Sequence, residues 1–409
     1  MGTFRGRYAV KIMGLAHSPK IVTDGLAFIY DTGSGKSYKG EPAENLWDSM
    51  LNTQALRSHT KHYWDGYKWL ENATYSNPGV EGPKGTYIGL VFKHTSGALN
   101  SVWSGNSYGY MLRDIVCTSG ATFTQSCWIY TSEDCDVTTL PSVIEGESGG
   151  ESAVTGYPAS YDLTNKGTWQ VTAKKAISDG NTRFIPLYPR KNGVTDGSFT
   201  GFFMWSLPQV VAGSHVVQPI QPGVTRSATQ GLLDLTNNAT INLSNVSFDS
   251  NAQMVFDGTD DYTSLGNPTA LRDLTSGTIE TVYYRDASSG TYQMVFTDAG
   301  SDLEITYLGN TLQFYIGNSG LSYTHAVTDQ WFNVVGTWGS GFKKLYINGV
   351  EVASGTNTGT DTGNRDRYVG GRGANFPFNG EIPIARIYGQ ALTDDEVLQN
   401  YNAFKSRFL

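Results

Sequence analysis

The stretch Lys343-Lys-Leu-Tyr-Ile-Asn-Gly-Val-Glu-Val-Ala353 predicts a β-hairpin. Apolar Leu345 and Ile347 alternate with polar neighbours before the turn, and the alternation resumes after it. Asn348-Gly349 is a residue pair preferred in type I′ turns, which need a positive φ at both central positions. We therefore expect two antiparallel strands joined by a tight turn.

A closing strand and a helix are predicted after this hairpin. Phe378-Asn-Gly-Glu-Ile-Pro-Ile-Ala-Arg-Ile-Tyr388 has the composition of a buried strand. Thr393 is a good helix N-cap, and Glu396 completes a capping box three residues later. The apolar residues that follow lie on one face of a helix over 393–405: Val397, Tyr401 and Phe404. We expect little helix elsewhere in the chain.

These segments together resemble the laminin-G-like branch of the concanavalin A-like lectin/glucanase superfamily. Further matching segments are Val255–Tyr262, Trp331–Trp338 and Tyr368–Gly371, so the resemblance covers about Gly231 to Leu409. It implies a jelly-roll sandwich. It does not imply an enzyme, because folds of this kind carry many functions.

The composition supports an all-β protein of more than one domain. A chain of 409 residues exceeds the usual size of one domain. The 48 glycines, 12% aromatic and only 16% charged residues are typical of many short strands joined by turns. We predict two jelly-roll β-sandwich domains in tandem with an extended N-terminal arm.

The predicted boundaries follow the turn and linker signals. Residues 1–40 would form the arm and a first strand at Gly25–Tyr30, and residues 41–226 a first sandwich. A proline-rich linker ends at 227–230, and residues 231–409 would form the second sandwich with the carboxyl-terminal helix.

The end of the segment 41–226 contains Trp205-x-x-Pro208-Gln209 and Gly213-Ser214, which precede a proline-rich exit. With these motifs, residues 41–226 resemble the carbohydrate-binding-module jelly rolls of phage tail and fibre proteins. Within this domain Thr122–Tyr130 alternates as a half-buried strand does, whereas Glu145–Glu151 is predicted to be a loop.

The amino-terminal segment has the composition of a docking arm. Residues 1–39 contain six basic and two acidic residues, a net charge of +4, so the rest of the chain carries −12. Lys20–Tyr38 resembles the opening of many tailed-bacteriophage virion proteins, which pair it with a laminin-G-like sandwich. The arm residues expected to contact a partner are Phe4, Arg5, Arg7, Tyr8 and Lys11.

One aromatic cluster is a candidate glycan-binding site. Tyr63-Trp-Asp-Gly-Tyr-Lys-Trp69 offers rings on which sugars stack and polar groups that bind hydroxyls. The candidate residues are Trp64, Asp65, Tyr67 and Trp69. The alternative is that these rings pack the sandwich or a subunit interface.

The carboxylates argue against catalysis. Glucanases of the resembling superfamily place two or three carboxylates alternately on one strand, where one is the nucleophile and another the acid/base. Asp302/Glu304 and Glu145/Glu147 each supply two and lack a third. We therefore predict no catalytic residues.

No cofactor or metal site is predicted. Asp31–Ser37 lacks the first glycine and the following helix of a phosphate-binding loop. His59 and His62 have no carboxylate at a metal-site spacing, and a structural calcium ion at Asp257–Asp261 is considered but not predicted. The cysteines match no zinc spacing and are expected to be free thiols: Cys117, Cys127 and Cys135.

We expect a non-enzymatic virion structural protein: a decoration, fibre, or tail- or neck-attached component. It would dock through its arm to other virion proteins (capsid, neck or tail). It would be a homo-oligomer or be present in many copies in the particle, which is assembled in the host bacterial cytoplasm. Binding of a cell-surface polysaccharide would be an added role. The sequence predicts no nucleic-acid partner, no membrane span and no secretory leader. The alternatives are a carbohydrate-binding adhesin or receptor-binding protein, and a glycoside hydrolase.

Overall fold

The protein is all-β and divides into two compact units. The computed structural model describes residues 20–46, 62–64, 69–71, 91–95, 111–136, 143–187, 200–218, 220, 224–249, 253–286, 288, 291–317, 319–361 and 364–408. The carboxyl-terminal unit joins the segment up to Pro42 to Ser227–Leu409, and the middle unit is Ala43–Arg226. The predicted fold class is confirmed. No helix in these ranges is long and apolar enough to span a membrane.

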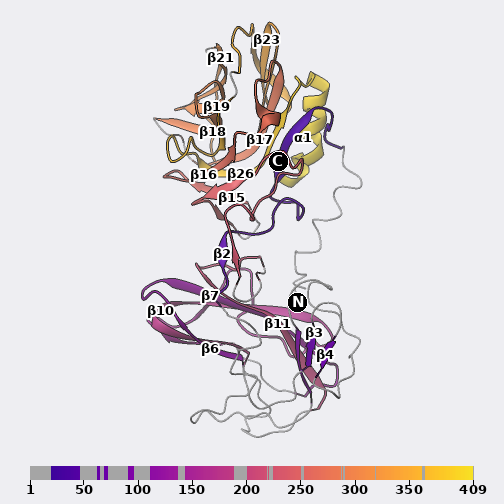
Figure 1. The fold of residues 1–409 in the computed structure, drawn as a ribbon, viewed down its shortest axis with the longest axis vertical. Helices are drawn as coiled ribbons and strands as arrows, with labels where there is room; N and C mark the ends of the chain where they lie inside the picture. Colours follow the sequence, from indigo (N-terminus) through magenta and orange to yellow (C-terminus); the bar gives the residue numbers. More distant parts are fainter. Residues whose placement is uncertain are drawn as a thin grey trace. The chain divides into compact units, whose positions relative to one another are not determined.

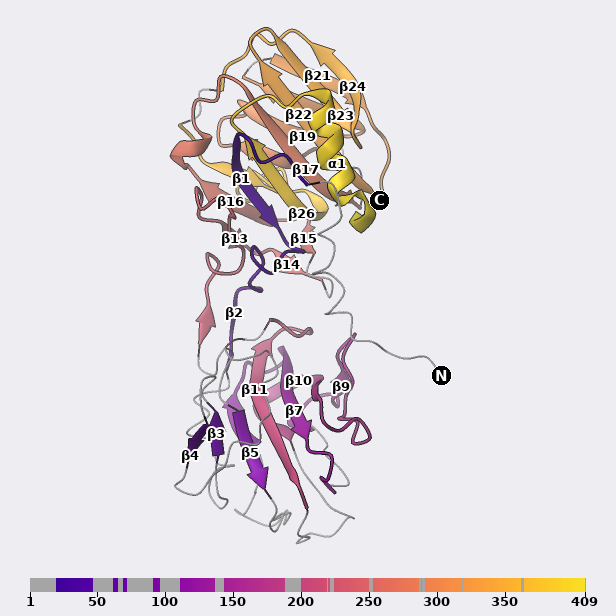
Figure 2. The same cartoon turned by 90° about the vertical axis from the view of Figure 1, so that its right-hand side faces the viewer.

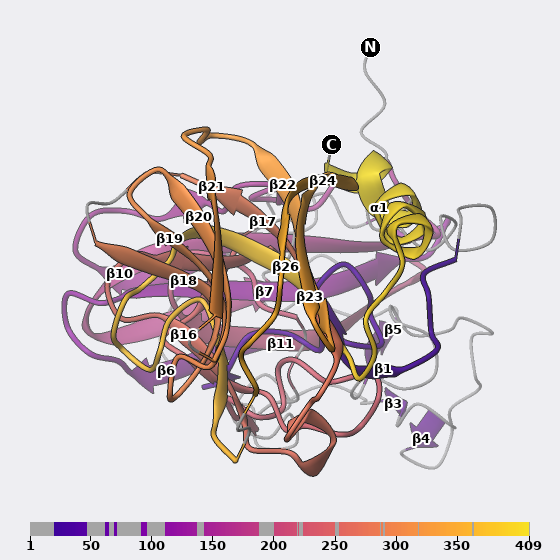
Figure 3. The ribbon, with the colours of Figure 1, turned by 90° about the horizontal axis from the view of Figure 1, so that it is seen from above.

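The carboxyl-terminal unit is a sandwich of two antiparallel sheets. The eight-stranded sheet has the order β14-β15-β26-β17-β22-β23-β24, with β1 also paired to β26. The seven-stranded sheet has the order β13-β16-β25-β18-β19-β20-β21. Seen from above, the two sheets form two layers, with helix α1 (Asp394–Phe408) outside the eight-stranded one (Figure 3).

The strands of this unit are mostly five to ten residues long. Those of the eight-stranded sheet are β1 (Leu26–Asp31), β14 (Ser247–Phe248), β15 (Met254–Asp257), β17 (Gly277–Arg285), β22 (Trp331–Gly339), β23 (Phe342–Ile347), β24 (Val350–Gly355) and β26 (Asn379–Tyr388). Those of the seven-stranded sheet are β13 (Asn242–Ser244), β16 (Tyr262–Gly266), β18 (Tyr292–Asp298), β19 (Leu303–Leu308), β20 (Thr311–Ile316), β21 (Ser319–Thr324) and β25 (Arg367–Val369). A single 3-10 turn lies at Thr269–Leu271.

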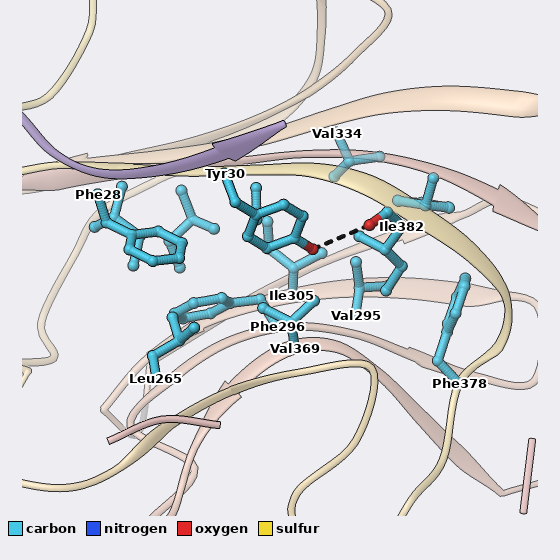
Figure 4. Close-up of a cluster of buried hydrophobic side chains, with 14 of the residues drawn as sticks. Phe28, Tyr30, Leu265, Val295, Phe296, Ile305, Val334, Val369, Phe378 and Ile382 are labelled. Carbon is cyan, nitrogen blue, oxygen red and sulfur yellow. Dashed lines mark hydrogen bonds between the residues drawn. The ribbon is translucent and has the colours of Figure 1, made fainter. Parts of the chain in front are cut away.

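The core lies between the two sheets, as strand alternation requires. Inward residues of both sheets meet there (Figure 4), and most have no exposed surface, among them Phe296, Ile305 and Val334. Tyr30 is fully buried in the same core, and its hydroxyl donates a hydrogen bond of 3.0 Å to the Ile382 carbonyl. The core therefore includes a residue from each end of the chain.

The predicted hairpin is confirmed in β23 and β24. Ile347 pairs with Val350, and the turn between them places Asn348 at φ 51° and Gly349 at φ 77°. These two positive φ values are what a type I′ turn requires. Asparagine and glycine reach this region at low steric cost, which explains the pair at this position.

Helix α1 is capped as its sequence predicts and covers the outer face of the eight-stranded sheet. The Glu396 amide donates to Thr393 Oγ1 (3.3 Å), and the Thr393 amide donates to Glu396 Oε2 (2.8 Å). Phe404 packs against Val282 and Ile384, which point away from the main core. The helix thus closes one outer face of the sandwich.

The first strand belongs to the carboxyl-terminal unit. The predicted strand is present as β1, which pairs with β26 from Leu26↔Tyr388 to Asp31↔Ile384 (Figure 2). Its free edge is held by Asp234, whose Oδ1 accepts the Ile29 amide at 3.1 Å. The segment grouped with the arm in the sequence therefore completes the sheet that ends the chain.

The middle unit is built around one long strand, β10 (Trp169–Leu187). Its first half pairs with β7, which also pairs with β11, and its second half pairs with β6 and β8 (Figure 1). A core that includes Phe123, Cys127 and Phe184 forms from these strands. The strands are β2 (Ala43–Glu44), β3 (His62–Trp64), β4 (Trp69–Glu71), β5 (Val91–Thr95), β6 (Met111–Val116), β7 (Thr122–Thr131), β8 (Val143–Glu147), β9 (Ser152–Ala153), β11 (Phe202–Ala212) and β12 (Thr225–Arg226).

Two local predictions in this unit were wrong. Glu145 and Glu147 lie in strand β8, not in a loop, because β10 continues far enough to pair with them. Strand β7 is buried on both faces over most of its length, whereas the alternation predicted one exposed face. Two of its polar side chains are hydrogen-bonded there: Thr124 Oγ1 donates to the Gly213 carbonyl at 2.8 Å, and Gln125 Nε2 donates to the Val143 carbonyl at 3.1 Å.

Candidate ligand-binding face of the seven-stranded sheet

The outer face of the seven-stranded sheet carries a row of polar and aromatic side chains. In β19, Leu303 and Ile305 point into the core, so Glu304 between them points outward. The register places Glu304 opposite Tyr315 of β20, and Tyr368 of β25 opposite Thr297 of β18. The Thr297 hydroxyl donates to Glu304 Oε1 at 2.8 Å, which links the two pairs into one row.

A loop after β25 covers part of this row. Its Arg372 side chain forms an ion pair with Glu304, and its guanidinium carbon lies 5.3 Å from the centre of the Phe376 ring. The Met294 amide donates to the Phe376 carbonyl at 3.0 Å, so the loop is tied to β18. Phe376 is 38% exposed and has φ 54°, which shows that the loop holds it in an uncommon conformation.

Two pairs of aromatic rings lie on this face. The Tyr262 and Tyr368 rings lie 6.0 Å apart, and the Tyr292 and Phe376 rings 5.9 Å apart, both edge to face. The Tyr315 ring lies across Gly320 of the next strand, where a Cβ atom would come within 2.6 Å of it. These tyrosines are half-buried.

Two polar atoms of this surface have no partner in the protein. Arg372 Nε and Gln313 Oε1 are both buried without a hydrogen bond. Gln313 lies opposite Thr306, which is two residues from Glu304 on the same face of β19. We call this surface the tyrosine face and define it by seven residues: Tyr262, Tyr292, Gln313, Tyr315, Tyr368, Arg372 and Phe376.

The tyrosine face has the chemistry of a sugar-binding surface. Aromatic rings stack on the apolar faces of pyranose rings, and adjacent donors and acceptors bind the hydroxyls. Here a donor (Arg372 Nε) and an acceptor (Gln313 Oε1) are unused. The structural alternative is that the rings only cover the polar outer row of the sheet.

The carboxylates of this sheet are held by arginines. Glu304 is buried and contacts Arg372, whereas Asp302 Oδ2 lies 2.9 Å from Arg365 Nη1. A glycosidase needs one carboxyl group as acid and a second carboxylate beside the reacting carbon. These two carboxylates are instead engaged by different guanidinium groups. In the middle unit, Glu145 and Glu147 lie opposite Arg183 and Ser178.

The sequence-predicted glycan site falls only in part within the described residues. The backbone of Trp64 in β3 pairs with that of Trp69 in β4. Asp65 and Tyr67 lie outside the described residues, as do the arm residues Phe4, Arg5, Arg7, Tyr8 and Lys11. The roles proposed for these residues therefore remain predictions.

Three carboxylates of the segment considered for calcium do converge. Single oxygens of Asp257, Asp260 and Asp261 lie within 4.8 Å of one another. All three groups already have partners in the protein: Asp257 Oδ1 accepts the Thr259 amide (2.7 Å), Asp261 Oδ2 accepts the Asp257 amide (2.8 Å), and Asp260 Oδ2 accepts Asn245 Nδ2 (2.9 Å). Burial raises the pKa of Asp261. These contacts explain the turn without an ion, and we assign no metal to it.

Acidic residues gather on the other sheet. Burial, Asp249 and Asp286 raise the pKa of Glu381 to about 7. Glu381 lies in β26, next to the core residue Ile382. The two outer faces of the sandwich thus differ in chemistry: one carries acids and helix α1, the other carries rings and an ion pair.

Residues 257–398 match the family model of the concanavalin A-like lectin/glucanases superfamily. The carboxyl-terminal unit therefore has the fold of this superfamily, as its hairpin and closing strand predict. The matched residues include every member of the tyrosine face. No curated protein matches the chain.

The chain is also similar in part to solved structures of other proteins. The botulinum neurotoxin serotype D ligand-binding domain in complex with N-acetylneuraminic acid is 14% identical, with a TM-score of 0.37, over 43% of this chain and 49% of that one. Domain 4 of the arabinanase AbnA from Geobacillus stearothermophilus, in complex with arabinotriose, is 20% identical, with a TM-score of 0.35, over 43% of this chain and 93% of that one. The chain spans about half the length of the toxin domains that it matches.

Proposed function

We propose that this protein is a non-enzymatic structural and adhesive protein whose carboxyl-terminal sandwich binds glycans on the tyrosine face. The observation that carries the proposal is the pairing of open aromatic rings with a buried, unused donor and acceptor on one sheet face. Buried polar atoms without partners are rare in native proteins, and a ligand that bonds them relieves the penalty. A saccharide offers both the hydroxyls and the apolar ring faces that this surface needs.

Replacing Tyr368 with alanine is expected to weaken glycan binding by roughly tenfold or more. The ring lies in the outer row opposite Thr297 and contacts Tyr262, so its loss removes about 1–2 kcal/mol of stacking. Glycan-array binding followed by calorimetry with the best saccharide would measure the change. Phe342→Ala is the matched control, because Phe342 is an exposed ring on the other sheet.

Equal glycan binding by the parent and by Tyr368→Ala would exclude the tyrosine face as the glycan-binding site. Loss of binding in the control as well would instead point to general unfolding, which circular dichroism detects. Release of reducing sugar by the parent would support the glycoside hydrolase alternative. In that case Glu304→Gln is the first variant to examine, since Glu304 is the buried carboxylate of this face.

We further propose that the protein is a component of a bacteriophage particle and docks to other virion proteins through its amino-terminal arm. Support comes from the resemblance of Lys20–Tyr38 to virion proteins and from the net charge of +4 in residues 1–39. Near the start of the described chain, the Val22 amide donates to Asn400 Oδ1 (2.8 Å) and the Val22 carbonyl accepts from Tyr388 (3.1 Å). The segment that follows the arm is therefore anchored to the sandwich.

Deleting residues 1–19 is expected to leave both units folded and to remove the protein from assembled particles. The deletion ends before Val22, so the anchoring hydrogen bonds remain. Incorporation into particles and the melting temperature of the free protein are the two measurements. An Arg5→Ala/Arg7→Ala variant should leave particles at lower salt than the parent, because salt screens charge pairs. Incorporation of the truncated chain at the parent level would place docking on the sandwiches.

A further inference from the structure

Arg285 is a buried cation at one end of the carboxyl-terminal sandwich. It ends strand β17 and has no exposed surface. Its Nη2 donates to the Gly309 carbonyl at 2.7 Å and to Gln293 Oε1 at 3.0 Å, and its Nε also donates to Gln293 Oε1. The guanidinium carbon lies 3.8 Å from the centre of the Tyr307 ring. These partners are all uncharged.

Two other buried arginines of this unit have the carboxylate partners that Arg285 lacks. Arg367 lies 2.8 Å from both Asp298 and Asp361, and Arg386 lies 3.0 Å from Glu280. Among the described residues, no carboxylate is within ion-pair distance of Arg285, and its Nη1 is buried without a hydrogen bond. Arg285 therefore lacks the counter-charge that the other two possess.

The groups around Arg285 do not supply a negative charge at neutral pH. The Tyr283 and Tyr307 hydroxyls are 2.8 Å apart, and the Tyr307 hydroxyl lies 2.7 Å from His325 Nδ1. Burial raises the pKa of Tyr307 to about 12 and that of Tyr283 well above its usual value. Burial and the Arg285 charge lower the pKa of His325, so its ring is neutral. The cluster thus carries one uncompensated positive charge.

We propose that Arg285 Nη1 binds a small inorganic anion of the size of chloride at this end of the sandwich. An isolated buried charge is strongly unfavourable unless it is paired. A monatomic anion suits the site because it needs few donors, and the Nη1 hydrogens, which have no partner in the protein, supply them.

The first test measures thermal unfolding of the full chain at constant ionic strength while chloride replaces gluconate. A ligand that binds only the folded state raises the melting temperature with its concentration. We expect a rise of about 2–4 °C once chloride exceeds its dissociation constant tenfold. Arg285→Lys should reduce or abolish this response, and Arg285→Met should remove it. Arg365→Gln is the matched control, since Arg365 is a half-exposed arginine already paired with Asp302.

The second test locates the ion even if the Arg285 variants fail to fold. Crystals of the parent grown in sodium bromide should show an anomalous peak within hydrogen-bond distance of Arg285 Nη1. Peaks only at exposed arginines would identify adventitious ions and would overturn the proposal. A water molecule at Nη1, with no bromide peak and no chloride-dependent melting, would overturn it as well.

Discussion

Replacing Asp234 with alanine is expected to lower the free energy of unfolding of the carboxyl-terminal unit by about 3–5 kcal/mol. Asp234 is 4% exposed, and its Oδ2 accepts the amides of Asn238 (2.9 Å) and Ala239 (3.0 Å). Its Oδ1 accepts the Ile29 and Thr236 amides. Alanine leaves several of these donors buried without an acceptor, and each such loss costs about 1–3 kcal/mol.

Urea unfolding of the parent and the variant would measure the difference, with an unchanged m-value as the sign of an intact two-state transition. Asp366→Ala is the matched control, because Asp366 is exposed and its side chain makes only a long contact with Tyr368. The loss of unfolding free energy in Asp234→Asn should lie between those in Asp366→Ala and Asp234→Ala, since the asparagine amide group replaces one acceptor by a donor. A loss below about 1 kcal/mol would show that water can replace the carboxylate, and that β1 does not depend on it.

Local sequence chemistry predicts the parts of this fold that depend on near neighbours. The Asn348-Gly349 turn and the Thr393/Glu396 capping box are set by residues within four positions, and both are present as predicted. The pairing of β1 with β26 joins residues more than 350 positions apart. No local pattern records that partner, so Leu26–Asp31 is recognisable as a strand but not as part of this sheet.

The tyrosine face was missed for the same reason. Tyr63–Trp69 is recognisable as a candidate because its aromatic residues are close together in the chain. In the tyrosine face, Tyr262, Tyr315 and Tyr368 come from the strands β16, β20 and β25, which share one sheet only through strand pairing. The sequence signal that could have revealed the tyrosine face is that these tyrosines occupy outward positions in strands of alternating pattern. The contact of Arg372 with Glu304 depends on the path of a loop, which alternation does not specify.

Replacing Glu280 with glutamine is expected to lower the free energy of unfolding by about 3–5 kcal/mol, because it leaves a buried arginine without its counter-charge. Glu280 has no exposed surface, and its Oε2 lies 3.0 Å from Arg386 Nη1 and accepts Asn400 Nδ2 at 2.8 Å. Its Oε1 accepts Asn333 Nδ2 at 3.1 Å. Glutamine keeps the volume but removes the charge, and its amide group would face other donors.

A double variant separates the effect of charge from that of shape. Replacing a buried ion pair by apolar residues is often neutral, whereas breaking it from one side is strongly destabilising. Glu280→Leu/Arg386→Met should therefore unfold at a higher urea concentration than either single variant. If the double variant loses as much as the sum of the two single variants, the Glu280–Arg386 pair is not the source of the effect, and the asparagine hydrogen bonds are.

Loss of the Glu280 charge is also expected to loosen the start of the described chain. Glu280 orients the Asn400 side chain, and Asn400 Oδ1 in turn accepts the Val22 amide at 2.8 Å. Asn400 Nδ2 also donates to the Tyr388 hydroxyl, which donates to the Val22 carbonyl. Hydrogen exchange at the Val22 amide should therefore accelerate in Glu280→Gln beyond what the global loss of stability explains. Exchange that changes only in proportion to global stability would show that Val22 is held independently of Glu280, and that the anchor of the arm does not depend on the buried ion pair.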